Sequence, residues 1–496
     1  MTEQILVVGS GIAGMCTSMA LARKGFAVTL LERDGQPPEG DADKAFFEWA
    51  RRGASQFRHP HAFLGLMCNL LQDNYPDLLE AFYAAGARKV GFKDMLSPEL
   101  SGKYTPEPGD EKLFVLMCRR ATIETVLRRY VSSFPGVRVL NGVHVDGLLS
   151  EKVDGKLVAR GVKVRRDCVE KFGAEIRADV VVDASGRTTK FPGWLEAEGI
   201  YIREESDDAE IVYYTRHYKL KPGQAEPPRG GKDRSAGDLG YIKFGVFPGD
   251  NGNFALIVCV HNDEKELREA IKDSNRFDTI CRSIPGLLPW VAPEVSEPTT
   301  ASFGIGDIRS VWRHWVQDGQ PLIRNFFAVG DASLRTNPLY GRGCSTGIMH
   351  AHLLADVLVA NPDADARAVQ FSERTESELR PIHQASLRED RNGIRRSHAV
   401  RQGKLLDQAK AGFKGWFEAA FGDAMASAAR HNLHVTRGMM RTFNLLEKPG
   451  EFLKDRKTQA IVFLYMLRGR TKNAAARIVR GPTRDETLKL IESTKG

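Results

Sequence analysis

The chain opens with two unbroken apolar runs that flank a segment rich in small residues. The runs cover residues 4–8 and 27–32, and the segment between them covers residues 12–24. Unbroken apolar runs of this length are typical of parallel strands that are covered on both faces. The pattern therefore predicts a strand–helix–strand unit of about 30 residues.

Further elements follow from the same criteria as far as residue 204. Hydrophobic periodicity predicts a helix over 63–85. The other predicted elements are strands over 113–118 and 178–183, a helix over 121–133, and a β-excursion over 137–149 and 156–166 with turns at Asn141-Gly142 and Asp154-Gly155.

The pattern changes between residues 205 and 300. Alternation of apolar and polar residues predicts strands over 210–219, 239–247 and 253–261, and residues 264–273 suit a short helix. The Pro- and Gly-rich stretch 221–238 is typical of an exposed loop. This combination indicates an antiparallel sheet inserted into the parallel framework, where substrate lids are usually found.

The first candidate for chemistry is the glycine-rich turn between the first strand and the first helix. Gly9 suits the tight turn, Gly11 lets a diphosphate approach the backbone, and Gly14 allows close packing of helix on strand. Glu32 ends the second strand, where a carboxylate accepts hydrogen bonds from ribose hydroxyls. The turn predicts dinucleotide binding and leaves FAD and NAD open.

A second glycine-rich turn lies far along the chain. A strand over 325–329 ends in Gly330-Asp331, and a helix follows over 344–360. Asp331 is placed to bind a ribityl hydroxyl, and Gly341 and Gly343 keep side chains away from a planar ligand. The N-terminus of the helix would stabilise negative charge on a reduced flavin. The two turns together indicate the two ends of one FAD molecule.

The predicted fold class is α/β. A Rossmann-like FAD-binding domain of the glutathione reductase type carries an inserted antiparallel-sheet substrate domain and a helical C-terminal region. The predicted limits are 1–204 and 301–365 for the FAD-binding domain, 205–300 for the substrate-binding sheet and 366–496 for the helical region.

Composition narrows the class further. The 496 residues carry a formal net charge of +8, which suits a mildly basic surface and does not call for nucleic acid. Seven cysteines without a CxxC favour a reducing cytoplasm over a disulfide framework or a zinc site. No secretory signal and no membrane span are expected. His59 and His61 lack the partners of a metal site, so no metal is predicted.

The tail after residue 365 is predicted to be helical and basic. Apolar faces come from Trp416, Phe417, Phe421, Met439, Met440, Phe443 and Leu445. The apolar segment 459–467 is flanked by Lys and Arg. Core packing or a subunit interface is the favoured interpretation, and contact of these helices with a membrane surface is the alternative. The oligomeric state is left open.

These motifs together resemble the FAD-dependent monooxygenases of the para-hydroxybenzoate hydroxylase type over residues 3–365. Within that superfamily three runs are similar to the flavin epoxidases of polyether biosynthesis. The runs are Arg51-x-Gly53-x-x-Gln56-x-x-His59-x-His61, Val181-Val182-Asp183-Ala184-Ser185-Gly186-Arg187, and Gly330-Asp331-Ala332 with Asn337-Pro338-x-Tyr340-Gly341-x-Gly343.

The chain departs from its relatives at several positions. Ser55 stands where the epoxidases usually have Pro, and the Trp-x-Trp-x-Ile-Pro signature of flavin halogenases does not occur around Trp312 and Trp315. Gly304-Ile305-Gly306-Asp307 lacks the third glycine of a second dinucleotide turn. This pattern fits transient binding of nicotinamide over the flavin, or a separate flavin reductase as partner.

The turns and the resemblance give a set of candidate cofactor-binding residues and no catalytic residue. The set is Gly9, Gly11, Ile12, Ala13, Gly14, Glu32, Arg33, Arg52, Gln56, Arg120, Asp183, Gly330, Asp331, Pro338, Gly341, Gly343 and Cys344. Tyr213, Tyr214, Tyr241 and His217 lie on the expected lid sheet, where structural roles are favoured.

The resemblance implies a monooxygenase that uses FAD, NAD(P)H as reductant, and O2. A C4a-peroxyflavin would hydroxylate or epoxidise an electron-rich, hydrophobic small molecule. The alternatives are a flavin-dependent reductase or dehydrogenase, for example of an isoprenoid double bond, a flavin-dependent halogenase, and a non-catalytic flavin-binding protein.

Overall fold

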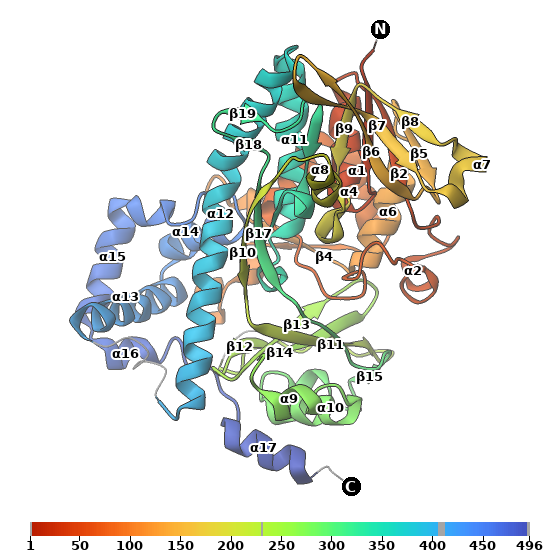
Figure 1. Cartoon of the computed structure of the whole chain (residues 1–496). Helices are drawn as coiled ribbons and strands as arrows, with labels where there is room; N and C mark the ends of the chain where they lie inside the picture. The colour runs from red at the N-terminus through yellow and green to blue at the C-terminus, as the bar shows by residue number, and fades with distance from the viewer. Residues whose placement is uncertain (1, 230–231, 405–411, 494–496) are drawn as a thin grey trace.

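A computed structural model describes residues 2–229, 232–404 and 412–493 (Figure 1). Its centre is a five-stranded sheet in the order β20-β9-β1-β2-β5, in which every neighbouring pair is parallel. The strands are β1 (Gln4–Val8), β2 (Ala27–Glu32), β5 (Val137–Asn141), β9 (Val180–Asp183) and β20 (Phe326–Ala328). The strand from the second half of the chain thus joins the sheet beside strands from the first 200 residues.

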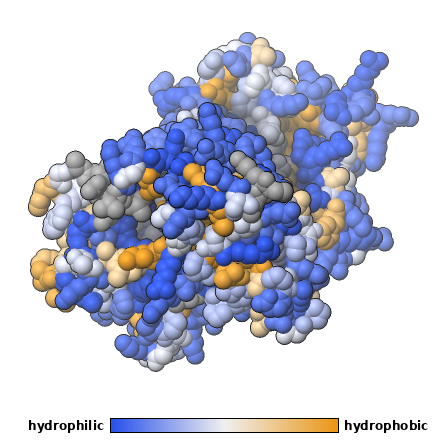
Figure 2. Space-filling model, turned by 90° about the horizontal axis from the view of Figure 1, so that it is seen from below, coloured by the Kyte–Doolittle hydropathy of each residue, from blue (hydrophilic) through white to orange (hydrophobic). Residues whose placement is uncertain are grey.

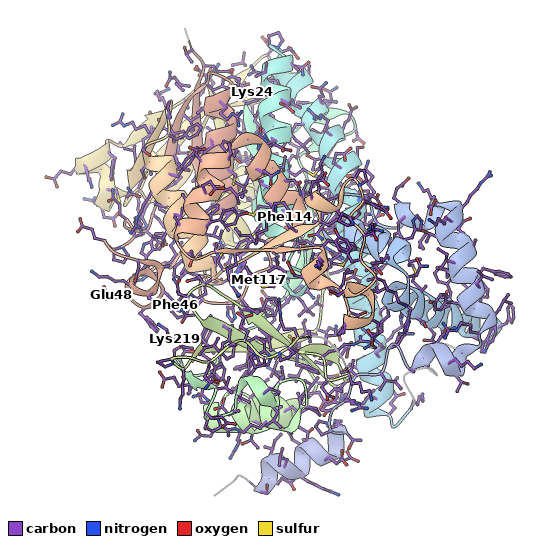
Figure 3. The ribbon with its side chains drawn as sticks, turned by 180° about the vertical axis from the view of Figure 1, so that it is seen from behind. Lys24, Phe46, Glu48, Phe114, Met117 and Lys219 are labelled. Atoms are coloured by element: carbon purple, nitrogen blue, oxygen red, sulfur yellow. The ribbon has the colours of Figure 1, made fainter. Side chains whose placement is uncertain are left out.

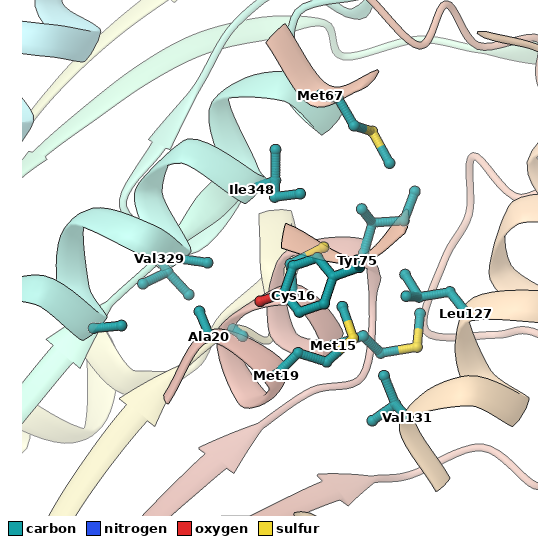
Figure 4. Close-up of a cluster of buried hydrophobic side chains, with 14 of the residues drawn as sticks. Met15, Cys16, Met19, Ala20, Met67, Tyr75, Leu127, Val131, Val329 and Ile348 are labelled. Atoms are coloured by element: carbon teal, nitrogen blue, oxygen red, sulfur yellow. The ribbon is translucent and has the colours of Figure 1, made fainter. Parts of the chain in front are cut away.

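Helices cover one face of this sheet. The covering helices are α1 (Ile12–Arg23), α3 (Gly65–Asn74), α4 (Pro76–Ala84), α6 (Arg120–Ser132) and α11 (Gly343–Ala360). Figure 4 shows Met15, Cys16 and Met19 of α1 packed among Ile348 of α11, Leu127 of α6 and Tyr75 between α3 and α4. Small residues on α1 allow this close approach, as the pattern over 12–24 predicts.

A small antiparallel sheet covers the other face of the parallel sheet. It consists of β6 (Val145–Val153), β7 (Lys156–Val164) and β8 (Glu175–Arg177), with α8 (Phe191–Ala197) beside it. Leu6 and Val8 of β1 point into this layer, whereas Ile5 and Val7 point toward the helices. Because both faces are buried, β1 reads as one unbroken apolar run. The predicted α/β architecture is confirmed.

The inserted segment forms a six-stranded sheet beneath this framework. Its path is β12-β13-β14-β11-β15, and β16 also pairs with β11. The strands are β11 (Ile211–Leu220), β12 (Ala236–Asp238), β13 (Ile242–Pro248), β14 (Asn253–His261), β15 (Ser296–Pro298) and β16 (Phe303–Ile305). Helices α9 (Lys265–Ala270) and α10 (Ser274–Ser283) cover its outer face.

The framework contacts this sheet through α2 (Ala42–Glu48), as Figure 3 shows from behind. The Phe46 ring lies 4.7 Å from the ring of His217 on β11. Arg119 pairs with Asp250 at the end of β13, at 2.6 Å. An antiparallel ribbon of β10 (Arg203–Asp208), β17 (Arg309–His314) and β21 (Leu334–Arg335) links the two units on the other side.

Helices form the remainder. The 38-residue α12 (Ala364–Arg401) runs along both units, and α13 (Gly412–His431), α14 (Leu433–Phe443), α15 (Arg456–Leu467) and α16 (Arg470–Ala474) pack beside it. The last helix, α17 (Arg484–Ser493), returns to the inserted sheet, where the Tyr241 hydroxyl meets that of Thr487 at 2.7 Å. The helical region predicted after residue 365 is confirmed.

Two predicted elements differ in detail. Residues 63–85 form α3 and α4, because Pro76 begins a new helix directly after Tyr75. The stretch 221–238, expected to be a loop, ends in the short strand β12. By length and composition α11 is the one described helix that could cross a membrane, and 67% of it is buried inside the molecule.

Candidate functional site

The two glycine turns line one cavity of about 340 Å³. Fourteen of the predicted residues line it together: Gly9, Gly11, Ile12, Ala13, Glu32, Arg33, Gln56, Arg120, Gly330, Asp331, Pro338, Gly341, Gly343 and Cys344. Parallel strands place their carboxyl ends at one edge of a sheet, so the ends of β1, β2 and β20 converge there.

The three glycines of the first turn, Gly9, Gly11 and Gly14, have different roles. Gly9 has φ of 102°, a left-handed conformation that favours glycine. A Cβ on Gly14 would lie 1.9 Å from the carbonyl oxygen of Gly9, so helix and turn touch there. A Cβ on Gly11 would meet nothing within 4 Å, because Gly11 faces the cavity. Gly14 therefore shapes the turn from outside the cavity lining.

Glu32 is buried at the end of β2 and held in place by several donors. The amides of Ser10 and Asp34 donate to its carboxylate at 3.2 and 2.8 Å, and Arg51 pairs with it at 2.9 Å. Burial alone would raise the pKa of Glu32, but Arg51 and these donors outweigh it, and the pKa is lowered. Glu32 is therefore ionised at neutral pH and faces the cavity as an acceptor.

Arg51 is the centre of this network and was not among the predicted residues. Its guanidinium contacts Glu32, Asp34 and Glu124 at 2.9 to 3.0 Å and is buried. The adjacent Arg52, which was predicted, is exposed and does not line the cavity. Sequence could not tell which arginine turns inward, because the segment is an irregular turn without periodicity.

Glu124 extends the network to the histidine run. Arg120 pairs with Glu124 and donates to Nε2 of His61 at 2.8 Å, while Nδ1 of His61 donates to the carbonyl of His59. Burial and the charge of Arg120 hold the pKa of His61 well below its usual range. His61 is therefore neutral, with its proton on Nδ1.

The second turn presents Asp331 and a helix N-terminus to the cavity. Gly330 has φ of 57°, and a Cβ there would lie 2.8 Å from the Cβ of Ala13 on α1. Burial raises the pKa of Asp331, against the opposing charges of Arg335 and Arg120. A Cβ on Gly341 would likewise lie 2.7 Å from the Cβ of Ala62. Glycine is thus needed where the two halves of the domain meet.

The six-stranded sheet forms the far wall of the cavity. Tyr213 of β11 and Ile305 of β16 line this wall, together with Ile308, which directly precedes β17, and His59 lines the same cavity. The Nδ1 atom of His59 lies 2.9 Å from the hydroxyl of Thr215, and its ring lies 4.9 Å from Phe303. Burial lowers the pKa of His59 to about 3 and raises the pKa of Tyr213. These four side chains are uncharged at neutral pH, whereas Asp307 and Arg309 beside Ile308 carry charge.

Asp183 lies beside the cavity without lining it. It is fully buried, and it accepts hydrogen bonds from the Ser185 amide at 2.9 Å and from the hydroxyls of Ser185 and Thr189. Burial raises its pKa despite these donors. Asp183 thereby fixes the turn that brings Ser185, Gly186 and Arg187 to the cavity.

Most of the charged residues in the lining are cationic. Arg33, Arg51, Arg120, Arg165, Arg187, Lys190, Arg309 and Arg335 face it, against the carboxylates of Glu32, Asp146, Asp307 and Asp331. Of these cations, Arg165, Lys190 and Arg309 lie on surface loops and strands that no motif marks. The cavity therefore suits an anionic ligand such as a dinucleotide.

These residues fit FAD. The helices α1 and α11 both begin at the cavity, and neither has a side-chain cap or an acidic residue in its first turn. Two uncapped helix N-termini at one cavity are a site for anionic groups. Glu32 lies at the end of β2, where a ribose would bind.

The glycines that line the cavity support the same fit. A Cβ at Gly11, Gly186 or Gly343 would meet no protein atom within 4 Å, so side chains are absent where a ligand needs room.

Solved structures share this fold. The flavin-dependent brominase Bmp2 matches 95% of this chain and 100% of its own at 16% identity and a TM-score of 0.60. PqsL, a probable FAD-dependent monooxygenase from Pseudomonas aeruginosa, matches 80% of this chain and 96% of its own at 17% identity and a TM-score of 0.55.

Sequence relatives cover the same region. Protein Rv3254 of Mycobacterium tuberculosis is 26% identical over 71% of this chain and 72% of its own length. The flavin-dependent halogenase gsfI of Penicillium aethiopicum is 24% identical over 68% of this chain and 61% of its own length. The family model of the FAD dependent oxidoreductases matches residues 4–360, which contain both glycine turns, and the chain belongs to that family of FAD-dependent enzymes.

Proposed function

We propose that the protein is a monooxygenase that uses FAD, NAD(P)H and O2 to hydroxylate or epoxidise a hydrophobic small molecule. The observation that carries the proposal is the group of uncharged side chains Tyr213, Ile305 and Ile308, which line the same cavity as the second glycine turn. A small molecule held on this wall would lie against the ring end of the cofactor. The resemblance to flavin epoxidases and the fold shared with PqsL support it.

The residues of the chain would bind the cofactor along its length. Glu32 would accept the ribose hydroxyls, the amides at the start of α1 would donate to the diphosphate, and Asp331 would meet the ribityl chain. FAD, when bound, would accept a hydride from the nicotinamide and would then react with O2. The N-terminus of α11 would stabilise negative charge on the reduced ring.

The wall residues would orient the substrate and exclude water. Tyr213 makes no hydrogen bond to another described residue, and its raised pKa keeps the phenol protonated, so it can donate to a substrate oxygen. His59 and His61 stay neutral and act as fixed hydrogen-bonding groups. Apolar side chains at this wall would exclude water from the site of the reaction.

Oxygen incorporation tests the proposal. The FAD-loaded protein is mixed with NADH or NADPH under 18O2 and screened against aromatic, polyene and terpenoid compounds by mass spectrometry. The expected result is substrate-dependent NAD(P)H oxidation and a product that gains one 18O atom. A Tyr213→Phe variant should raise KM without loss of FAD, since the Tyr213 hydroxyl makes no hydrogen bond to another described residue.

The other reactions have separate arms in the same screen. Saturation of a substrate by reduced FAD under anaerobic conditions would establish a reductase, and substrate halogenation in bromide or chloride would establish a halogenase. The segment Gly304-Ile305-Gly306 lies in and directly after β16 of the antiparallel sheet and does not form a second dinucleotide turn. Because this segment would not bind nicotinamide as a second dinucleotide turn does, a parallel set of assays contains a separate flavin reductase that supplies reduced FAD. Purified protein that binds no FAD would contradict every enzymatic proposal.

A further inference from the structure

Helix α15 (Arg456–Leu467) is apolar on two opposite faces. Thr458, Ile461, Val462 and Tyr465 face inward, and Val462 packs against the small residues Ala424 and Ala428 of α13. At 100° per residue, Phe463, Leu464 and Leu467 lie on the opposite face. Their exposed fractions are 59%, 61% and 68%. A helix that is apolar all round is usually buried on both sides, so the outward face lacks a partner among the described residues.

Cations border this outward face at both ends. Arg456 and Lys457 precede the apolar stripe and Arg468 follows it, and all three are exposed. None of them pairs with a carboxylate of another described residue, and Arg468 lies over the ring of Tyr465 at 4.7 Å. Figure 2 shows apolar side chains at the left edge of the molecule, the side on which Figure 1 places α13, α15 and α16. The stripe is thus apolar in the middle and positive at each end.

This charge pattern distinguishes between two partners for the outward face of α15, namely a second copy of the chain and an anionic surface with an apolar interior. In a twofold contact between two copies, the same patch meets itself. Both ends of the stripe are cationic, and the neighbouring Asp455 is already paired with His434 at 2.7 Å. A parallel and an antiparallel pairing would therefore each bring cations together. An anionic surface with an apolar interior satisfies both features, since Phe and Leu enter the apolar layer while Lys and Arg stay at the charged boundary.

We infer that the outward face of α15 binds the surface of an anionic phospholipid bilayer, with Phe463, Leu464 and Leu467 inserted and Arg456, Lys457 and Arg468 at the headgroups. The neighbouring α13 also exposes Phe413, Trp416 and Phe417. The inference does not depend on the reaction at the cavity.

Vesicle binding by the full-length, FAD-loaded protein tests the inference. The probes are vesicles of phosphatidylcholine alone and vesicles with 30% phosphatidylglycerol. Co-sedimentation is expected with the anionic vesicles, and it should weaken as NaCl is raised. Replacing Arg456 and Lys457 by Gln should weaken binding about fivefold for each cation removed.

A matched pair of leucine variants separates insertion from general surface apolarity. Leu464→Ser should reduce binding at least tenfold, whereas Leu288→Ser, which changes an exposed leucine near α10, should leave it unchanged. Both variants should retain FAD and helix content, because both side chains are exposed. Equal binding to neutral and anionic vesicles, or equal effects of the two Ser variants, would overturn the inference. A concentration-dependent dimer that Leu464→Ser abolishes would overturn it in favour of a second copy.

Discussion

At the scale of single residues, two adjacent arginines have opposite environments. Arg51 is enclosed by three carboxylates, and Arg52 is exposed. Removal of Arg51 leaves buried negative charge uncompensated, which costs about 3–5 kcal/mol. We expect Arg51→Met to lower the unfolding free energy by that amount and to release FAD, and Arg52→Met to change stability by less than about 0.5 kcal/mol. Urea unfolding and FAD titration measure both effects, and similar results for the two variants would contradict the network.

The first turn offers a second residue-scale prediction. A Cβ on Gly11 enters the cavity, whereas a Cβ on Gly14 collides with backbone. Gly11→Ala should therefore fold normally and lose FAD affinity, because the methyl group occupies the place of the diphosphate. Gly14→Ala should lower stability by several kcal/mol, as expected of an overpacked core. Circular dichroism and FAD fluorescence separate the outcomes, and full FAD retention by Gly11→Ala would refute the assigned geometry.

Sequence alone identifies site residues where a regular element fixes their direction. Gly9, Gly11 and Glu32 follow from strands and a helix of defined period, and all line the cavity. Arg51 and Arg187 belong to the runs that carry the resemblance but were not predicted to line the site, and Arg309 lies in no motif. The positions of these three side chains depend on how distant segments pack. Asp183 was predicted to bind the cofactor and lies at the end of a central strand. Its carboxylate instead accepts hydrogen bonds from the hydroxyls of Ser185 and Thr189.

At the scale of elements, the uncapped start of α11 carries a prediction. Gly343 is its first residue, and a Cβ there meets no protein atom within 4 Å. Gly343→Asp should stabilise the FAD-free protein by about 0.3–1 kcal/mol, because a carboxylate complements the helix dipole. The same charge should weaken FAD binding, most strongly for the reduced form. Gly343→Ala controls for bulk, and equal FAD affinity of the two variants would exclude an electrostatic role of this helix end.

Elements were predicted well where burial is uniform and poorly where chain direction changes. The strand β1 and the helices α1 and α11 lie close to their predicted limits, because hydrophobic runs and periodicity define them. The break between α3 and α4 is local, and Pro76 signals it. The return of α17 to the inserted sheet depends on tertiary contacts, such as Ile491 in the core of that unit, which no local pattern encodes.

At the scale of the whole molecule, buried neutral histidines predict sensitivity to acid. Burial lowers the pKa values of His59 and His350 to about 3 and of His217 to about 4. The unfolded chain takes up protons near pH 6.5 and the folded chain does not, so stability is present above pH 6.5 and is lost as the pH falls toward 4. Each histidine contributes about 1.4 kcal/mol per pH unit.

Urea midpoints between pH 7.5 and 4.5 measure this slope. His350→Gln should flatten it by one proton. A midpoint that stays constant below pH 6.5 would contradict the buried neutral state of these side chains.

The elements that line the cavity are synthesised at different times. Its walls come from β1 and α1 at the start of the chain and from β20 and α11 several hundred residues later. At roughly 5–20 residues per second, a ribosome needs tens of seconds to pass from one wall to the other. During that interval the growing sheet exposes first the edge of β1, which pairs with β9, and then the edge of β9, which pairs with β20. The lining of the cavity is therefore complete only after β20 and α11, and with them the inserted sheet, have been made.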